Sequence, residues 1–396
     1  MIKATRARQE FEARFFLGHM SEYDGELTRL VEQVNRSAKE SKADEIKLLD
    51  QFLTAAIERR ASDLLFVANS PAVLRVTGAL IGGFGQSLSP AELRSILLPI
   101  LTAEQIAELQ TRKSLDFCFV RKSIGRFRAN YHFQRGTLAA SIRLLPEQVP
   151  TLESLHLPPG LALLAERRQG LVLVTGPTGC GKSSTLAGLI DLINNRRRDH
   201  IITIEDPVEF QHPNHSSIVE QIELGHDTPS FAQAVRSALR QDPDVILIGE
   251  MRDSETMAAA LTAAETGHLV LSSLHTNDAA QTVLRILDIF PSTYQSQIRQ
   301  QLSLALLAVI SQQLLPASTG IGRYPAVEIM FATHAIRNLI RRGDDHQLRT
   351  HIETSRSEGM LTMEQSLAEL VRAGQVSREA AFDHSHHPED LKRYLS

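Results

Sequence analysis

The sequence predicts an α/β protein in which an α+β domain is followed by a phosphate-binding α/β domain and a helical C-terminal part. Three observations support this class. Short strand-like runs with turn signals fill much of residues 47–150, apolar runs alternate with helical stretches from residue 170, and a glycine-rich loop follows the first of those runs. With 396 residues, the chain is long enough for two hydrophobic cores.

Composition narrows the class of protein further. Apolar residues make up 42% of the chain, charged residues 22%, and the net charge is −4, as in ordinary soluble domains without a general basic excess for nucleic acid. The two cysteines, Cys118 and Cys180, imply neither a disulfide framework nor a zinc site. The N-terminus does not resemble a secretory signal, and the longest apolar stretch, 302–310, is too short to span a bilayer. We therefore expect a cytoplasmic protein without a transmembrane segment.

The first half of the chain divides into an extension, a domain and a linker. Residues 1–46 are polar and charged, and we expect a helical extension there. The domain, residues 47–150, opens with a predicted helix. Prolines between residues 146 and 159 predict a linker over 151–169. Within the domain, period-2 alternation and turn residues predict strands at 63–68, 72–76, 80–84, 115–120, 125–134 and 139–145, with a helical stretch at 90–109.

The second half has the pattern of a parallel sheet. Continuous apolar strands separated by helices are typical of sheets covered on both faces. The helical period recurs over 291–315 and 334–382. We therefore expect a nucleotide domain at 170–333 and a helical region at 334–396. The predicted buried strands lie within the apolar runs 171–176, 201–206, 244–250 and 268–275.

Residues 176–183 match the phosphate-loop pattern G-x-x-x-x-G-K-[ST], and they lie between a predicted strand and a predicted helix, as the pattern requires. Inward-turned backbone N–H groups and the positive end of the helix dipole make an anion cradle. Lys182 can reach the β- and γ-phosphates of ATP, and Ser183 can ligate Mg²⁺. The expected nucleotide contacts are Gly176, Pro177, Thr178, Gly179, Cys180, Gly181, Lys182, Ser183 and Ser184.

Hydrolysis also needs an acid that orients magnesium and a group that positions water. Carboxylates follow two predicted strands, at the strand ends where α/β sheets bind ligands. Glu250 is the expected magnesium acid, while either Glu205 or Glu209 orients or activates water. His268 and His275 flank the apolar run 269–274, and a spacing of seven does not suit one metal pair. His275 is either a γ-phosphate sensor or a structural histidine.

Four segments in this order resemble the secretion and type IV pilus motor ATPases. They correspond to the Walker A loop, Asp box, Walker B strand and His box of that superfamily, and the resemblance covers residues 47–382. Residues 335–341, AIRNLIR, make the chain most similar to the PilT-like retraction ATPases. Two cysteines exclude the four-cysteine zinc insertion that is usual in the assembly branch. The segments read GPTGCGKS, ITIEDPVEF, DVILIGEMRD and GHLVLSSLHTNDA.

The resemblance implies a homohexameric motor that hydrolyses ATP with Mg²⁺ and powers pilus retraction and twitching motility. Each subunit would have a PAS-like N-terminal domain and a RecA-like domain, and the ring would associate with the inner membrane through a pilus platform protein. The resemblance also supports catalytic roles for His268 and His275 of the His box. It assigns Arg126 and Arg128 to the nucleotide, and Arg236 and Arg240 to charge stabilisation across a subunit boundary. For each of these arginines, a surface ion pair is the alternative.

The sequence departs from the family pattern at several positions, and other functions are alternatives to pilus retraction. Ile222 and Leu224 stand where arginine and valine are common, and Arg342 where an acid is common. An alternative is a type IV secretion or conjugation ATPase. A nucleic-acid translocase is disfavoured by charge and by the absence of a basic stripe with aromatic residues. A binding module with an inactive loop is disfavoured by the lysine and acids. In AIRNLIR, the helical period places Ile336, Leu339 and Ile340 on one face and Arg337 and Arg341 on the other.

Overall fold

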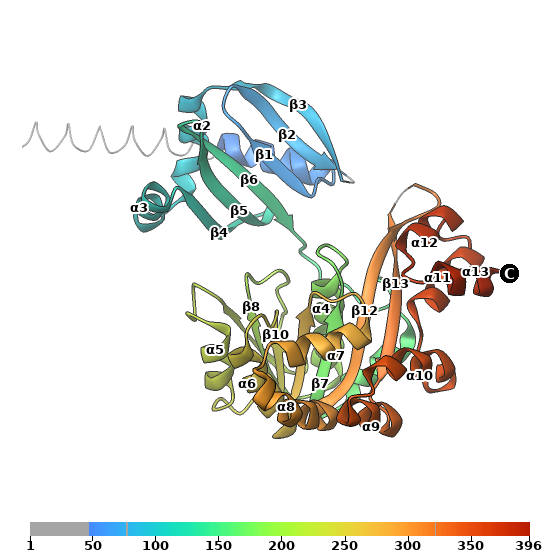
Figure 1. The fold of residues 1–396 in the computed structure, drawn as a ribbon. Coiled ribbons are helices and arrows are strands. Elements are labelled where there is room, and N and C mark those ends of the chain that lie inside the picture. The colour runs from blue at the N-terminus through green and yellow to red at the C-terminus, as the bar shows by residue number, and fades with distance from the viewer. Residues whose placement is uncertain (1–46, 77, 321) are drawn as a thin grey trace, which may run out of the picture. The chain divides into compact units, whose positions relative to one another are not determined.

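The computed structural model describes residues 47–76, 78–320 and 322–396, and the chain forms two compact units that join between Leu145 and Pro146. Figure 1 labels most of their helices and strands. The expected extension, residues 1–46, lies outside the described residues. The mixed α/β architecture predicted from the sequence is confirmed. Among the residues described, no helix is long and apolar enough to cross a membrane.

The first unit is a six-stranded antiparallel sheet with helices packed on one face. The helix at residues 47–58, α2 (Pro90–Leu97) and α3 (Ala103–Arg112) share a core with the buried face of the sheet. The helical stretch predicted at 90–109 is two helices, because a 3₁₀ turn containing Pro99 separates them. In spatial order the strands are β3 (Ala79–Leu88), β2 (Ser70–Val76), β1 (Asp63–Phe66), β6 (Thr137–Leu145), β5 (Gly125–Gln134) and β4 (Ser114–Arg121).

The second unit is built on a seven-stranded sheet in which only β13 runs antiparallel to its neighbour. The central strands are buried along their whole length, which explains their continuous apolar sequences. In spatial order the strands are β13 (Arg323–Phe331), β12 (Leu306–Pro316), β7 (Gly170–Thr175), β11 (Leu269–Leu274), β10 (Val245–Ile248), β8 (His200–Glu205) and β9 (Ile218–Glu223).

Helices cover both faces of this sheet. One face packs on α4 (Lys182–Arg196) and on a 3₁₀ segment (Pro159–Glu166), so the stretch expected as a linker, 151–169, contributes buried leucines to this unit. The other face packs on α5 (Phe231–Ala238), α6 (Ser254–Glu265), α7 (Ala279–Asp288) and α8 (Ser292–Ala305). The helical character predicted for 334–382 is confirmed. It comprises α9 (His334–Arg342), α10 (Leu348–Thr354), α11 (Met363–Arg372) and α12 (Arg378–His384), and α13 (Pro388–Leu395) follows.

The helix predicted over 291–315 is wrong in its second half. Helix α8 ends at Ala305, and residues 306–316 form β12 instead. Residues 306–310, the second half of the apolar run 302–310, fit either a buried helix or a strand covered on both faces, and their long-range pairing with β7 and β13 decides for the strand. Strands β9 and β13 were not predicted. Because β12 lies beside β7, it brings polar side chains next to the phosphate loop.

Candidate nucleotide-binding site

The phosphate loop joins β7 to α4 and depends on glycine at three positions. Gly176, Gly179 and Gly181 have positive φ angles of 138°, 80° and 93°. At Gly176 a Cβ atom would also overlap the carbonyl oxygen of Gln312 and lie 2.7 Å from the Cys180 sulfur. The residue at the N-cap of α4 is Gly181, which has no side chain to cap the first turn, so backbone N–H groups of this turn can bind an anion.

The Gln312 side chain in β12 holds this loop and the first turn of α4 by two hydrogen bonds. Its Nε2 donates to the Cys180 carbonyl, and its Oε1 accepts from the Thr185 hydroxyl at 2.8 Å. The neighbouring Ser311 hydroxyl lies 2.8 Å from that of Thr175, the residue before the loop. Sequence reasoning missed Gln312, because it lies 132 residues from Cys180 in a segment expected to be helical. Reading 306–316 as a buried strand would have been the signal.

The Lys182 ammonium group lies at the centre of the site. Its Nζ donates to the carbonyls of Gly176 at 2.9 Å and Pro177 at 3.0 Å, and it lies 3.4 Å from Nδ1 of His275. Burial lowers the pKa of Lys182, and the charges of Glu250 and Glu209 act in the opposite direction. Two of the three acids predicted from the sequence, Glu209 and Glu250, therefore lie close enough to act on this ammonium group.

His275 links the lysine to Glu250. Its Nε2 lies 3.6 Å from the Glu250 carboxylate, whose other oxygen pairs with Arg252 at 2.8 Å. Burial, followed by the nearby Lys182 charge, lowers the pKa of His275 and favours the neutral imidazole. The carboxyl ends of β7, β10 and β11 are adjacent in the sheet, so the structure brings Lys182, Glu250 and His275 together.

Glu205 ends β8 and is held in a polar pocket of its own. Its Oε1 accepts from the Thr203 hydroxyl at 2.7 Å and from Nε2 of Gln221 at 3.3 Å. Burial raises the pKa of Glu205, and the like charge of Glu209 adds to the shift. Gln221, which the sequence reasoning did not single out, also donates to the Phe210 carbonyl at 2.8 Å. It therefore contacts both Glu205 and Phe210, the two ends of the short segment that carries the two glutamates.

Two predicted catalytic residues lie away from the phosphate loop. His268 precedes β11, whereas His275 follows it, and a six-residue strand separates them by about 20 Å. The His268 ring lies 3.0 Å from the Ala263 carbonyl at the end of α6. Arg240 follows α5 and donates to the Arg236 carbonyl, while the Arg236 guanidinium pairs with Glu255 at 2.6 Å. Within the described residues of this unit, neither His268 nor Arg240 contacts the loop.

Arg126 and Arg128 belong to the first unit. In β5 they alternate with buried Phe127 and Ala129, so they lie on the sheet face opposite the core. Arg128 stands across from Arg143 of β6. The second unit does not contain these arginines, and their assignment to the nucleotide remains a prediction from the resemblance.

The donor set suits a magnesium ion that is bound together with phosphates. Ser183 is exposed in the first turn of α4, and the Glu250 side chain is 16% exposed. Among the described residues, no group of three or more His, Cys, Asp or Glu side chains forms a metal cage. Mg²⁺ commonly takes one or two protein ligands and completes its shell with phosphates and water. Ser183 and Glu250 therefore fit Mg²⁺ with ATP.

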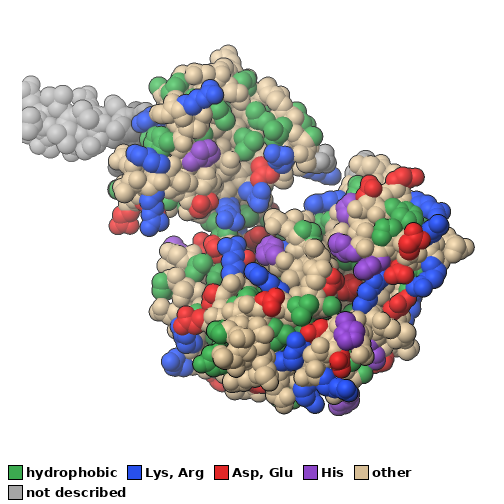
Figure 2. Space-filling model, in the orientation of Figure 1, with side chains coloured by type: hydrophobic (Ala, Val, Ile, Leu, Met, Phe, Trp, Pro, Cys, Tyr) green, Lys and Arg blue, Asp and Glu red, His purple; other side chains and the backbone are tan. Residues whose placement is uncertain are grey.

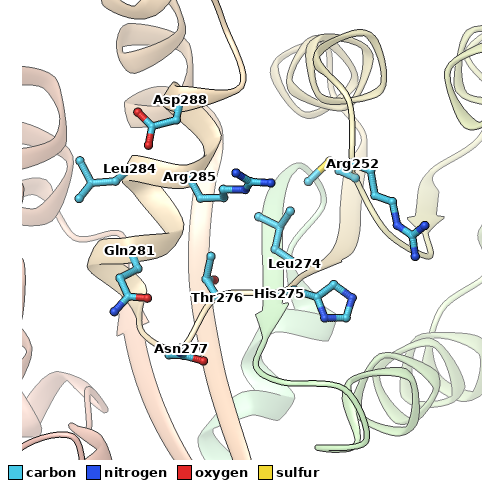
Figure 3. A pocket seen from close by; sticks show the side chains of 10 residues that line it. Arg252, Leu274, His275, Thr276, Asn277, Gln281, Leu284, Arg285 and Asp288 are labelled. Carbon is cyan, nitrogen blue, oxygen red and sulfur yellow. The ribbon is translucent and has the colours of Figure 1, made fainter.

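A pocket of about 660 Å³ opens beside His275. Figure 3 shows His275 and Arg252 on one side and side chains of α7 on the other. The pocket therefore extends from His275 to the side chains of α7. The lining residues are Met251, Arg252, Leu274, His275, Thr276, Asn277, Gln281, Leu284, Arg285 and Asp288.

Comparison with known proteins agrees with the resemblance expected from the motifs. A twitching motility protein of Neisseria gonorrhoeae is 44% identical over 335 residues, which cover 84% of this chain and 89% of the relative. The type IV pilus retraction ATPase PilT of Pseudomonas aeruginosa is 42% identical over 343 residues, covering 87% and 99%. A crystal structure of the pilus retraction motor PilT with bound ADP matches with a TM-score of 0.81 and 43% identity, covering 87% and 98%.

The resemblance to the retraction ATPases is thereby confirmed. The sequence model described as Type II/IV secretion system protein matches residues 38–382, which is most of the chain. The chain therefore belongs to the type II/IV secretion system protein family.

Proposed function

We propose that the chain is the ATP-hydrolysing motor that retracts type IV pili and so powers twitching motility. The observation that carries the proposal is the meeting of Lys182, His275 and Glu250 beside a phosphate loop. It is supported by the similarity, over most of the chain, to proteins named for twitching motility and pilus retraction. The same similarity favours retraction over the alternative of a type IV secretion ATPase.

Each side chain would have a distinct part in ATP hydrolysis. Ser183 and Glu250 would hold Mg²⁺, which neutralises charge on the β- and γ-phosphates. Lys182 would exchange its loop carbonyls for phosphate oxygens, and a neutral His275 would contact the γ-phosphate from the end of β11. Glu205 has a raised pKa and would accept a proton from the attacking water more readily than an ordinary carboxylate.

Assembly and location follow from the family and form part of the same proposal. The motor would be a homohexamer of subunits with a PAS-like N-terminal domain, held at the cytoplasmic side of the inner membrane by a pilus platform protein. Work would come from different nucleotide affinities of two subunit conformations, because a ligand shifts such an equilibrium by its differential affinity. Arg126, Arg128, Arg240 and His268 stay in the proposal as contributors to the assembled ring.

Nucleic acid is not an expected partner. On the face of the second unit that Figure 2 shows, basic and acidic side chains are interspersed. This face presents no continuous basic stripe of the kind that tracks a phosphate backbone. Turnover of ATP should therefore be the same with and without single- or double-stranded DNA, and stimulation by either would favour a translocase instead.

The site assignment is tested by replacing Lys182 with alanine. The variant should lose ATP turnover, because no other cation in the loop reaches the β- and γ-phosphates, and it should still assemble, as checked by size-exclusion chromatography with light scattering. Lys392→Ala, an exposed lysine in α13, is the matched control and should keep wild-type turnover. Normal turnover in Lys182→Ala would reject the site.

A further inference from the structure

A buried carboxylate lies in the β12–β13 hairpin at the level where the phosphate loop begins. Glu328 of β13 is only 5% exposed and stands directly opposite Ser311 of β12. Ser311 in turn pairs with Thr175 at the end of β7, and their hydroxyls are 2.8 Å apart. Since directly paired residues point to the same face of a sheet, Thr175, Ser311 and Glu328 form one polar row. The residue of β11 that pairs with Thr175 is Leu274, which directly precedes His275.

The Glu328 carboxylate binds the first turn of α7. Its Oε1 accepts the backbone N–H of Ala279 at 2.9 Å. That N–H is one of the groups at a helix start that have no partner within the helix, and an anion there is favoured by the helix dipole. Asp278 caps the same turn by accepting from the Gln281 N–H at 2.7 Å. Two carboxylates from different parts of the chain therefore fix where α7 begins.

The connection between β11 and α7 is short and tied to this turn. Only residues 275–278 separate the two elements, and His275 is the first of them. The buried Thr282 hydroxyl donates to the Asp278 carbonyl at 2.7 Å and lies 2.7 Å from the hydroxyl of Thr276. A shift of the first turn of α7 is therefore transmitted over three residues to the imidazole beside Lys182.

We propose that Glu328 is a positioning residue for ATP hydrolysis, which anchors the first turn of α7 to the β12–β13 hairpin and thereby holds His275 against the phosphate loop. This inference rests on the proposed role of His275 at the γ-phosphate. Glu328 touches neither His275 nor the loop, so it acts through Ala279 and the short connection. Gln281 of the same turn lines the pocket beside His275, together with side chains from later turns of α7 (Figure 3).

The charge of Glu328 changes in the neutral pH range. Burial raises its pKa to about 7, the hydrogen bond from Ala279 opposes this, and the charges of Asp278 and Glu364 add to it. Arg349 of α10 acts in the opposite direction to these two acids. An ionised carboxylate accepts a hydrogen bond more strongly than a protonated one. Ionisation of Glu328 above pH 7 should therefore tighten the anchor and raise kcat.

The test is the pH profile of steady-state ATP turnover by the full-length protein with Glu328→Gln. The amide keeps the size of the side chain and an accepting oxygen, but it carries no charge. We expect kcat at pH 8 to fall roughly tenfold, the KM for ATP to stay within about twofold, and the rise of kcat through pH 7 to flatten. Glu328→Asp keeps the charge and withdraws it by one methylene, so it should keep the pH-dependent rise with a lower kcat.

Glu364→Gln is the matched control, since Glu364 is 1% exposed and its carboxylate pairs with Arg349 of α10. Removing its charge should shift the rise in kcat to lower pH without abolishing it. Wild-type kcat and pH profile in Glu328→Gln, with Lys182→Ala inactive, would overturn the inference while leaving the proposed function intact. Full turnover in Lys182→Ala would instead reject the proposed function. If Glu328→Gln does not fold, as shown by circular dichroism, a wild-type kcat in Glu328→Asp overturns the inference.

Discussion

The support of the phosphate loop by β12 makes a quantitative prediction for Gln312→Leu. Leucine is similar in size but removes the amide, so the Cys180 carbonyl and the Thr185 hydroxyl both lose a buried partner. A buried polar group without a partner costs about 1–3 kcal/mol, and rotation of the Thr185 hydroxyl recovers part of this. A net cost of about 2–3 kcal/mol to the nucleotide-binding form of the loop corresponds to roughly 30- to 150-fold weaker binding.

Titration with fluorescent ADP in the presence of Mg²⁺ measures this change, and circular dichroism checks that the variant is folded. Gln313→Leu is the matched control, because the adjacent side chain is also nearly buried but contacts the His386 ring at 3.0 Å and not the loop. Its affinity for ADP should stay within about threefold of wild type. The reasoning fails if Gln312→Leu binds ADP as tightly as wild type, or if both variants weaken binding equally.

Three further predictions concern the loop, the buried glutamate and α9. Gly176→Ala should abolish ADP binding, because its Cβ would overlap the Gln312 carbonyl. Gly179→Ala has open space around its Cβ, so it should bear only the strain of its positive φ and weaken ADP binding about tenfold. Equal losses of ADP affinity in the two variants would contradict this. Glu328 has a folded pKa of about 7 against an ordinary value of 4.5, so its stabilisation is present below pH 4.5 and is lost as pH rises through 7. Urea unfolding should show that the free energy of unfolding falls between pH 5 and pH 8, and that Glu328→Gln removes about 3 kcal/mol of this fall. The same fall in the variant as in the wild type would refute the raised pKa of Glu328. In α9, Arg341→Ala and Arg342→Ala should keep ATP turnover, because both side chains are exposed. Arg337→Ala should lower the thermal midpoint of unfolding, because its guanidinium binds the carbonyls of Ser303 and Ala332. If Arg341→Ala or Arg342→Ala reduced turnover as much as Lys182→Ala, the exposed face of α9 would serve hydrolysis.

Local signals explain what could be predicted from the sequence. The phosphate loop, the strands that flank it and the acids at strand ends depend on short spacings, and parallel strands align their carboxyl ends automatically. Lys182, Glu250 and His275 therefore come together as expected. In α9, the helical period placed Ile336 and Ile340 on one face, and both are fully buried. These features need only the sequence within a few residues and the topology of the sheet.

Long-range pairing explains what could not be predicted. Residues 306–310 have apolar side chains that suit a helix or a strand, and only pairing with β7 and β13 selects the strand. Gln312 and Glu328 gain their roles from that pairing, so no local pattern marks them. His268 was grouped with His275 by resemblance, although the two residues lie at opposite ends of strand β11.

The central claim is that this chain powers pilus retraction by ATP hydrolysis at the Lys182 loop. Its most direct test is the number of surface pili, counted by electron microscopy, on cells that lack the chain and carry either the wild-type or the Lys182→Ala gene. The account predicts excess pili and no twitching with Lys182→Ala, and normal numbers with the wild type. Cells without pili would indicate an assembly motor, and normal pili and twitching with Lys182→Ala would contradict the account.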